Sequence, residues 1–371
     1  MSIEIFPKSS ANTIWYNDTK TYYISSSANT IAWYSQEANP FENKVILVTG
    51  GTGFIGSSFC RKFLDMGAKK VISFSRRWND SEKLKNKLGN DPRLRCVNGD
   101  IVDYQSLLYA TKGVDYILHT AAYKAVDSAE YNSQECTRVN VVGSINVINA
   151  AIENNVKGVF GISTDKACAP INTYGRTKAL MESLFVNANS LGNTMFSVAR
   201  YANVAGSSGS VIHKFAESIT EDMIANVTDP DMTRFYFTEH DAIEFVYSSF
   251  LDMIESEERG LVYIPKMKST TTPELAQAIT NYLWGADKNV SPKINIIGVR
   301  PGEKMHESMI DKAEVANDIG DRYVIYPPVC YWDAYQTKRG KQLEAGTEYT
   351  SFNTERFNEK ELQELIKAVF N

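Results

Sequence analysis

The stretch VTGGTGFIG, residues 48–56, constrains the fold more than any other part of the chain. It follows KVILVT (44–49), an apolar run with the length of a buried strand, and it leads into a helical pattern over 55–66. Gly50, Gly53 and Gly56 permit a tight turn and let backbone amides approach an anion at a helix N-terminus. This strand–turn–helix pattern predicts a dinucleotide-binding βαβ unit. A plain structural turn is the alternative.

Apolar runs of strand length recur up to about residue 205. They are VISFS (71–75), LRCVNGD (94–100), DYILHT (115–120), GVFGIST (158–164) and MFSVAR (195–200). Helical patterns lie between them, with a long one over 130–154 and another that opens near Tyr174. Such alternation predicts a parallel sheet covered on both faces, with right-handed crossovers. The expected fold class is therefore α/β, with a doubly wound parallel sheet.

After residue 205 the alternation loosens. Short strand patterns over 233–237 and 261–265 mix with helical patterns over 239–256 and 273–284. We expect an aromatic-rich N-terminal arm (1–43), a dinucleotide-binding domain (44–205), and a part (206–371) that is mainly a smaller substrate-binding lobe with a C-terminal tail. The arm holds the near-repeat SANTIWY and SANTIAWY. It is expected to pack on the protein's own surface or on a neighbouring subunit, and a separate binding function is the alternative.

Composition narrows the class of protein. The chain is 43% hydrophobic and 22% charged, as in ordinary globular proteins, and its net charge of −5 without a basic stripe gives no support for nucleic-acid binding. No apolar stretch reaches the length of a membrane span, and no signal peptide is indicated. Five scattered cysteines and unclustered histidines favour neither a metal site nor a disulfide framework, and they indicate a reducing cytoplasm.

The end of the second strand pattern indicates which dinucleotide binds. Ser75, Arg76 and Arg77 stand where an NAD enzyme usually carries an acid for the ribose 2′-hydroxyl. An arginine there suits a 2′-phosphate, so the sequence favours NADP over NAD and makes 44–205 an NADP-binding domain. Solvated loop charges are the alternative.

Further cofactor contacts are expected around the same edge of the sheet. Asp100 follows the third strand and is placed to meet the adenine, whereas the small residues after the fourth strand leave room for the ribose. His119 is expected to be a core histidine. The full set of expected cofactor contacts is Gly50, Gly53, Phe54, Ile55, Gly56, Ser75, Arg76, Asp100, Ile101, Ala121, Ala122, Tyr174 and Lys178.

Candidate catalytic residues lie in STDKACAPINTYGRTK, residues 163–178. Tyr174 and Lys178 are one helical turn apart and share a face. A nearby ammonium and a positive nicotinamide favour the phenolate, so Tyr174 is expected to take a hydroxyl proton while hydride leaves the same carbon. Lys178 would also hold the nicotinamide ribose. An ordinary exposed helix face is the alternative for such a pair on its own.

Asp165 and Lys166 suggest a longer reaction. Oxidation of a hydroxyl to a ketone makes the neighbouring C–H acidic, so a base can remove that proton while an acid helps the next hydroxyl leave as water. The hydride then returns to the emptied carbon, without net redox change. Burial favours the neutral forms of both groups, as this chemistry requires, and their mutual attraction opposes it. A structural ion pair is the alternative.

These motifs resemble the extended short-chain dehydrogenase/reductase superfamily, which has a Rossmann-like fold. Within it the chain is most similar to inverting UDP-N-acetylglucosamine 4,6-dehydratases of polysaccharide biosynthesis, through AAYKAVDSAEYN, ARYANVAGSSGSVI, GVRPGEKMHE and the triplet TDK (164–166). The resemblance implies that Asp165, Lys166 and Tyr174 are catalytic. It also implies conversion of UDP-N-acetylglucosamine to a UDP-4-keto-6-deoxy sugar with inversion at C5. Whether Lys166 or Tyr174 acts on each face of C5 stays open.

The resemblance also implies a set of nucleotide-sugar contacts and an assembly. Arginines suit a diphosphate, and a carboxylate suits ribose hydroxyls. Family members often form oligomers, so a homo-oligomer is expected. A UDP-sugar epimerase and a non-catalytic NADP-binding sensor or scaffold are the alternative functions. The implied substrate contacts are Lys124, Thr164, Asn203, Arg234, Arg300 and Glu303.

Overall fold

The computed structural model describes residues 22–25, 31–34, 39–207, 209–285, 290–328 and 338–370. Near the N-terminus, β1 (Tyr22–Ser25) and β2 (Ile31–Tyr34) form an antiparallel pair. Of the near-repeat, only 31–34 lies within the described residues. The end of the expected arm enters the main body, because Phe41 is fully buried and packs edge-on against Phe63 and Phe250.

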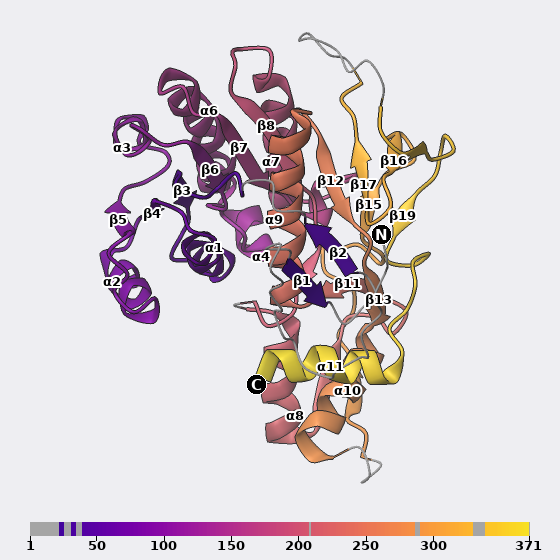
Figure 1. Ribbon diagram of the computed structural model, residues 1–371. Helices are drawn as coiled ribbons and strands as arrows, with labels where there is room; N and C mark the ends of the chain where they lie inside the picture. Colours follow the sequence, from indigo (N-terminus) through magenta and orange to yellow (C-terminus); the bar gives the residue numbers. More distant parts are fainter. Residues whose placement is uncertain are drawn as a thin grey trace, which may run out of the picture.

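A large sheet forms the centre of the molecule (Figure 1). Within the described residues, its parallel part has the spatial order β5, β4, β3, β6, β7, β8, β12. This order reverses between β3 and β6, the kind of switch point at which open α/β sheets bind ligands. The predicted α/β class and parallel sheet are confirmed. The bounds are β3 (Val45–Thr49), β4 (Lys70–Ser75), β5 (Leu94–Asn98), β6 (Tyr116–His119), β7 (Gly158–Ile162), β8 (Met195–Ala199) and β12 (Val262–Pro265).

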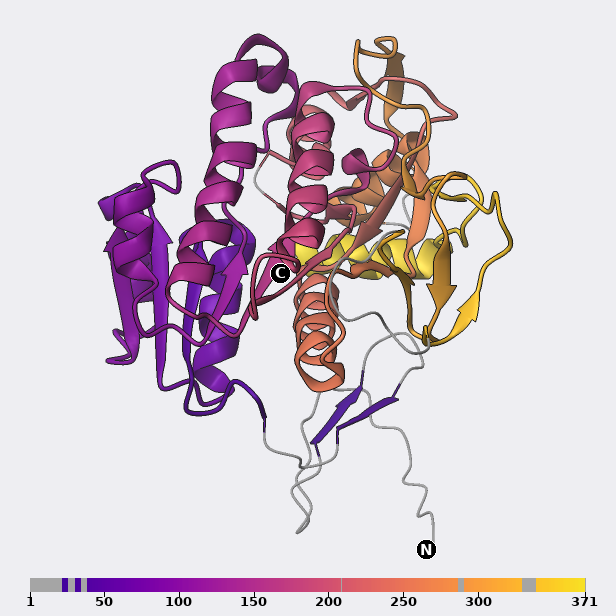
Figure 2. The same ribbon diagram turned by 90° about the horizontal axis from the view of Figure 1, so that it is seen from above.

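Helices cover both faces of the sheet (Figure 2). A strand that is covered on both faces reads as a continuous apolar run, as in β3, where Ile46, Leu47 and Val48 are fully buried. On one face α1 packs against α9, and on the other α6 packs against α3 and α7. The bounds are α1 (Phe54–Asp65), α2 (Trp78–Lys87), α3 (Tyr104–Ala110), α6 (Gly143–Glu153), α7 (Thr173–Ala188) and α9 (Glu239–Ser256).

The long helix predicted over 130–154 is present from Ser133 to Glu153, but it contains a π-helical turn and the chain is interrupted just before it. The segment is divided into α4 (Val126–Tyr131), α5 (Ser133–Thr137), a π-helical turn η1 (Arg138–Val142) and α6. Asn132 interrupts it with a non-helical backbone, φ −123° and ψ 46°. Within η1, the Asn140 amide bonds both the amide and the carbonyl of Tyr123, at 2.7 and 3.1 Å. Polar side chains that bond a neighbouring loop compete with regular helical spacing.

The second half of the chain contributes to the same sheet. Beyond β12, the antiparallel strands β17 (Arg322–Ile325), β16 (Ala316–Asp318) and β18 (Lys341–Gln342) extend it. The boundary that we placed at residue 205 therefore separates chain segments, while the sheet takes strands from both sides of it. Among the described residues, no helix is long and apolar enough to cross a membrane.

The remaining elements form a smaller lobe with its own apolar core, in which α10 packs against α8 and α11 (Figure 1). Three small sheets accompany it: β10–β14 contributes to the core of the lobe, and β9–β11–β13 and β15–β19 also pack on the core of the main body. Cys60, Cys96, Cys136 and Cys168 are free thiols, and Cys330 lies outside the described residues. The bounds are β9 (Asn203–Val204), α8 (Val211–Asp222), β10 (Ile224–Val227), β11 (Thr233–Phe237), β13 (Lys268–Thr271), α10 (Thr272–Trp284), β14 (Lys293–Ile296), β15 (Ser308–Ile310), β19 (Tyr349–Thr350) and α11 (Glu359–Phe370).

Candidate active site

The glycine turn joins β3 to the N-terminus of α1. Gly50 has a φ of +68°, and a Cβ there would lie 2.9 Å from the backbone of Ala121. A Cβ on Gly56 would lie 2.2 Å from the carbonyl oxygen of Gly50, and the Gly53 amide donates to that same oxygen at 2.8 Å. Side chains are therefore excluded at this turn. The first amides of α1 face the switch point without side-chain caps, which suits a pyrophosphate.

The residues expected to select the cofactor follow β4. The Ser75 hydroxyl accepts a hydrogen bond from the Thr52 amide at 3.2 Å, which ties this strand end to the glycine turn. Arg76 is exposed, whereas Arg77 pairs with Asp80 at 2.7 Å. Of the two arginines, Arg76 is thus the one available to a phosphate beside the turn.

The other expected cofactor positions surround the switch point. Ile101 is buried against Gly143, Ala121 is half-buried beside Gly50, and Ala122 is exposed. The carboxylate of Asp100 accepts a hydrogen bond from the Val102 amide at 3.1 Å. These contacts position the loops that follow β5 and β6 without filling the space above the turn with large side chains.

His119 is a core histidine, as predicted. It is buried, it hydrogen-bonds Thr49 at 2.8 Å and Ser144 at 3.2 Å, and it stacks on Phe185. Burial lowers its pKa to about 3, and the charge of Lys178 acts in the same direction. It is therefore a neutral structural group.

Asp165 and Lys166 form a short 3₁₀ turn, η2 (Asp165–Ala167), directly after β7. Asp165 is fully buried, and its Oδ1 accepts hydrogen bonds from the Thr164 hydroxyl at 2.8 Å and from Lys166 Nζ at 3.0 Å. Its Oδ2 has no hydrogen-bond partner among the described residues. The pair predicted from the sequence exists, and one carboxylate oxygen remains available to a donor.

Helix α7 packs against this turn and places Tyr174 beside it. Asn172 caps the helix by accepting from the Gly175 amide at 2.7 Å, and a Cβ on Gly175 would lie 2.2 Å from the carbonyl oxygen of Lys166. The glycine thus permits close contact between η2 and α7. Burial raises the pKa of Tyr174 to about 12, and the ammonium of Lys166 and a hydrogen bond with Thr164 oppose this rise.

Lys178 does not play the electrostatic part expected of it in this state. Its ammonium donates to the carbonyl oxygen of Ile162 at 2.6 Å, and burial lowers its pKa to about 8. The cation that lowers the pKa of Tyr174 is Lys166, although burial outweighs its effect. We expected Lys178 to act on Tyr174 because the two share a helix face. The ammonium of Lys178 instead hydrogen-bonds a backbone carbonyl at the end of β7.

For the protonation of Lys166, the sequence analysis set burial against attraction to a carboxylate. Burial would lower its pKa, as a base requires, but the carboxylates of Asp165 and Glu307 outweigh burial and raise the pKa above its ordinary value. Glu307 was missed by the sequence analysis. It is buried at the end of GVRPGEKMHE, with Oε1 at 3.6 Å from Lys166 Nζ. A carboxylate at a conspicuous motif's end was the available signal.

The predicted substrate contacts divide into two groups. Arg234 is buried near Glu307, and it pairs with Glu303 at 3.2 Å. Asn203 donates to the carbonyl oxygen of Phe235 at 3.0 Å, in the strand pair that carries Arg234. By contrast, Arg300 is exposed and pairs with Asp127 at 3.4 Å, and Lys124 is exposed. The structure thus gathers Thr164, Arg234 and Glu303 around the buried cluster and leaves Arg300 and Lys124 at the surface.

A buried arginine links neighbouring segments of the site through ion pairs. Arg200, which follows β8, donates to both oxygens of Glu182 on α7, at 3.1 and 2.6 Å. It also donates to both oxygens of Glu314, each at 2.8 Å. The Cys168 thiol donates to Glu314 at 3.6 Å, so the network reaches the segment after η2.

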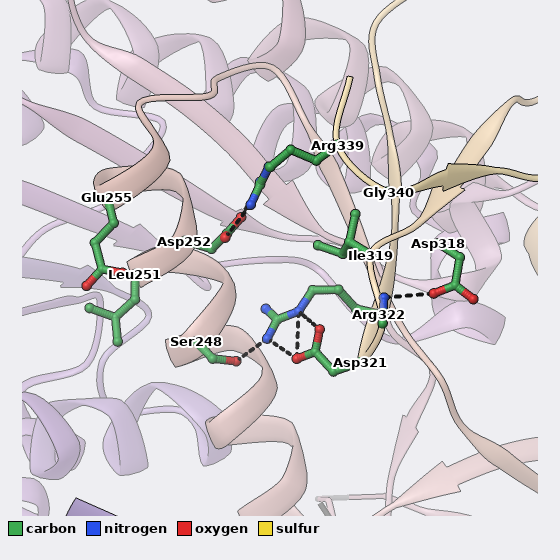
Figure 3. A pocket seen from close by; sticks show the side chains of 11 residues that line it. Ser248, Leu251, Asp252, Glu255, Asp318, Ile319, Asp321, Arg322, Arg339 and Gly340 are labelled. Carbon is green, nitrogen blue, oxygen red and sulfur yellow. Dashed lines mark hydrogen bonds and ion pairs between the residues drawn. The ribbon is translucent and has the colours of Figure 1, made fainter. Parts of the chain in front are cut away.

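A separate hollow of about 520 Å³ lies between α9 and the strands β16 to β18, and none of its lining residues belongs to the cluster described above (Figure 3). Its charges pair with one another: Arg322 with Asp321 at 2.5 Å, and Arg339 with Asp252 at 2.7 Å. It has no part in the chemistry discussed below.

The chain is similar to curated proteins over most of its length. It is 38% identical over 345 residues to an inverting UDP-N-acetylglucosamine 4,6-dehydratase of Campylobacter jejuni, covering 88% of this chain and 98% of that protein. It is 37% identical over 339 residues to a UDP-glucose 4-epimerase of Rickettsia conorii, covering 88% and 96%.

Solved structures share the fold. The structure of Pen from Bacillus thuringiensis matches with a TM-score of 0.78 and 32% identity, covering 88% of this chain and 98% of that one. A dTDP-glucose 4,6-dehydratase from Streptomyces venezuelae, solved with NAD bound, matches with a TM-score of 0.62 and 24% identity over 70% of this chain and 86% of that one. The profile of the family described as "Polysaccharide biosynthesis protein" matches residues 46–326. The chain therefore belongs to this family, and its predicted resemblance to inverting UDP-N-acetylglucosamine 4,6-dehydratases is confirmed.

Proposed function

We propose that this protein is a nucleotide-sugar 4,6-dehydratase that converts UDP-N-acetylglucosamine to UDP-4-keto-6-deoxy-N-acetylhexosamine with inversion at C5. The observation that carries the proposal is the buried cluster in which Asp165 and Lys166 pair at 3.0 Å beside Tyr174. A simple dehydrogenase needs one proton-transfer group, whereas elimination of water needs further ones. The similarity to the Campylobacter jejuni dehydratase supports this substrate and this outcome.

In this proposal, different side chains carry out the separate proton transfers. Tyr174 accepts the proton of the C4 hydroxyl. Asp165 and Lys166 serve the elimination, in which the C5 proton is removed and the C6 oxygen is protonated as it leaves. Lys166 and Tyr174 are the candidates for the two faces of C5, and inversion requires that removal and return occur on opposite faces. The buried positions of Asp165 and Tyr174 limit access of water to the reacting carbons.

The residues at the switch point fit a nicotinamide dinucleotide, because the glycine turn excludes side chains where a pyrophosphate would lie. We propose NADP, held by Gly50, Gly53 and Gly56 on its pyrophosphate and by Arg76 on its 2′-phosphate. Such a cofactor, when bound, supplies a reversible two-electron oxidation. We assign cofactor binding chiefly to residues 44–205.

The later lobe supplies most of the proposed sugar-nucleotide contacts. Arg234 carries the positive charge that a diphosphate requires, and the half-buried Glu303 has one carboxylate oxygen without a hydrogen-bond partner among the described residues, which suits a ribose hydroxyl. Thr164 and Asn203 lie beside the cluster, and Arg300 would contribute when the lobe engages a ligand. Lys124 completes the proposed set.

The direct test uses the purified full chain and UDP-N-acetylglucosamine without added reductant. We expect a 4-keto product that has lost one water, with deuterium at C5 when the reaction is run in deuterated water. Lys166→Ala should retain cofactor and lose almost all product. The matched control is Lys266→Ala, which removes an ion pair with Asp318 at 2.8 Å on the far edge of the sheet. Unchanged sugar in the wild-type reaction would overturn the proposal.

An epimerase is the second candidate, because the Rickettsia conorii relative is nearly as similar as the dehydratase. The same experiment separates the two, since epimerisation leaves the mass of the sugar unchanged and dehydration lowers it by one water. A non-catalytic NADP-binding sensor would give neither product while still binding the cofactor.

We further propose that the protein acts as a cytoplasmic homo-oligomer. The four free thiols support a reducing compartment. Light scattering of the purified chain and fractionation of the cells that produce it are the measurements that test these two points.

A further inference from the structure

Glu307 contacts the catalytic cluster from the opposite half of the chain. Its side chain is buried, and among the described residues its charged contacts are Lys166 Nζ at 3.6 Å and Arg234 Nε at 3.9 Å. Its second oxygen, Oε2, is buried without a hydrogen-bond partner among those residues. A buried carboxylate with a purely structural role usually has its oxygens hydrogen-bonded. This one faces two cations instead.

The backbone of Glu307 is held rigidly. Its amide donates to the hydroxyl of Ser351 at 2.9 Å, and its carbonyl accepts from the Ser351 amide at 2.8 Å. Ser351 is fully buried and also hydrogen-bonds Thr233 at 2.7 Å. The strand that follows, β15, packs against η2. These hydrogen bonds fix the backbone of Glu307 and so hold its carboxylate near Lys166. Residues that position catalytic groups are commonly supported in this way.

The groups around Lys166 come from several elements and carry opposing charges. On its own turn lies Asp165, and α7 contributes a buried phenol. Strand β11 contributes a cation and a second buried phenol, and the segment before β15 contributes the second carboxylate. The titratable and charged groups facing Lys166 are Asp165, Tyr174, Arg234, Tyr236 and Glu307. Two anions therefore bracket the ammonium.

We propose that Glu307 is a positioning residue that holds the side chain of Lys166 as a charged ammonium beside Tyr174, from the C-terminal lobe. This inference deepens the proposed dehydratase function and rests on it. Asp165 is adjacent to Lys166 in sequence and moves with the same turn. Glu307 belongs to the lobe, so it fixes Lys166 relative to the part of the protein that is proposed to hold the sugar nucleotide.

The first test measures the proton affinity of Lys166 without turnover. Trace labelling with acetic anhydride at pH 9, followed by mass spectrometry of the peptide that contains Lys166, reports the fraction of free amine. Loss of a carboxylate at this distance should lower the pKa of the lysine by about one unit or more, so Glu307→Gln should label about tenfold faster. Glu303→Gln, which removes a carboxylate paired with Arg234, should change the rate less than about twofold.

Glu307→Asp separates charge from access, since it retains the carboxylate while altering the packing. Its labelling rate should stay within about threefold of the wild type. The proposal is overturned if Glu307→Gln labels Lys166 at the wild-type rate, or if Glu307→Asp is accelerated as much as Glu307→Gln. Should Glu307→Gln not fold, Lys166→Met/Glu307→Gln should melt at a higher temperature than Lys166→Met, because the latter leaves the buried Glu307 carboxylate without the nearer of its two cations. An equal or lower melting temperature would refute the pairing.

The second test uses turnover and distinguishes the two proposals. With UDP-N-acetylglucosamine, Glu307→Gln should lower kcat about tenfold or more and leave KM within about threefold, because Lys166 acts after binding. A wild-type kcat overturns the positioning role. If the wild-type protein releases no water, the dehydratase proposal fails by itself, and the labelling result still decides whether Glu307 holds Lys166.

Discussion

Replacement of Arg200 by methionine should destabilise the whole protein. The guanidinium is 3% exposed and donates to both oxygens of Glu182 and of Glu314, at 2.6 to 3.1 Å. Methionine fills a similar volume but leaves the buried carboxylate of Glu182 and the partly buried carboxylate of Glu314 without their cation. Breaking a buried charge pair by removing one partner costs about 3–5 kcal/mol.

The expected change in melting temperature follows from the size of the protein. Unfolding entropy is about 2.1 cal/mol/K per residue. For a chain of 371 residues this gives about 0.8 kcal/mol/K, so a loss of 3–5 kcal/mol lowers the midpoint by about 4–6 °C. The assay is thermal denaturation followed by circular dichroism, with wild type and Arg200→Met at equal concentration and both without added cofactor.

A triple variant tests the physical cause. Arg200→Met combined with Glu182→Gln and Glu314→Gln removes the uncompensated charge and should recover more than half of the lost stability, because buried charge networks replaced as a whole cost little. The reasoning is refuted if Arg200→Met melts within about 1 °C of the wild type. It is also refuted if the triple variant melts below the single one.

Two further predictions concern the cofactor and pH. Arg76→Ala should weaken NADP binding about tenfold or more and leave NAD binding within about threefold, because it removes the cation placed for the 2′-phosphate; calorimetric titration that shows equal losses for both dinucleotides would contradict this. Burial lowers the pKa of Lys178 to about 8, below its ordinary 10.5, so between these values the unfolded chain binds the proton that the folded one has lost. The stability of the wild type should therefore rise from pH 8 to pH 10 relative to Lys178→Met. If the denaturant midpoints of the two proteins differ by the same amount at both pH values, this prediction is contradicted.

Local patterns were sufficient to predict the first half of the fold. Apart from β5 at the edge of the sheet, the strands from β3 to β8 are short apolar runs with buried side chains on both faces, and their boundaries are read from hydrophobicity. The glycine turn was equally visible, because the lack of a side chain at Gly56 is a property of the sequence itself. The steric reason for a glycine at this position is a carbonyl oxygen that would lie 2.2 Å from a Cβ, and only the structure reveals it.

The long helix shows how far local patterns reach. Residues 133–153 are helical, as the pattern predicted, but they contain a π-helical turn over 138–142. Within this turn Asn140 bonds the backbone of Tyr123 and also donates to the Thr177 hydroxyl at 3.0 Å. A helix pattern contains no information about such partners outside the segment, so the local change of helical spacing could not be predicted.

The contact that Glu307 makes could not be predicted, for a related reason. Its contact with Lys166 joins residues far apart in the chain, and it depends on two strands, β15 and β19, that are only three and two residues long. Elements this short have no detectable periodicity. The extension of the main sheet by β12 and β17 was missed as well, because pairing between separate short strands is specified by the whole core and not by either strand alone.

The structure also changes which lysine supports the phenolate of Tyr174. The sequence places Lys178 one turn away, but its ammonium is bound to the carbonyl oxygen of Ile162. Lys166 is bracketed by two carboxylates, and its charge lowers the pKa of Tyr174 more than the adjacent Asp165 raises it. The two carboxylates therefore also act on Tyr174 indirectly, because they keep Lys166 protonated. Burial nevertheless raises the pKa of Tyr174 to about 12, so the phenol keeps its proton in the substrate-free protein and the charge of Lys166 only makes that proton easier to remove.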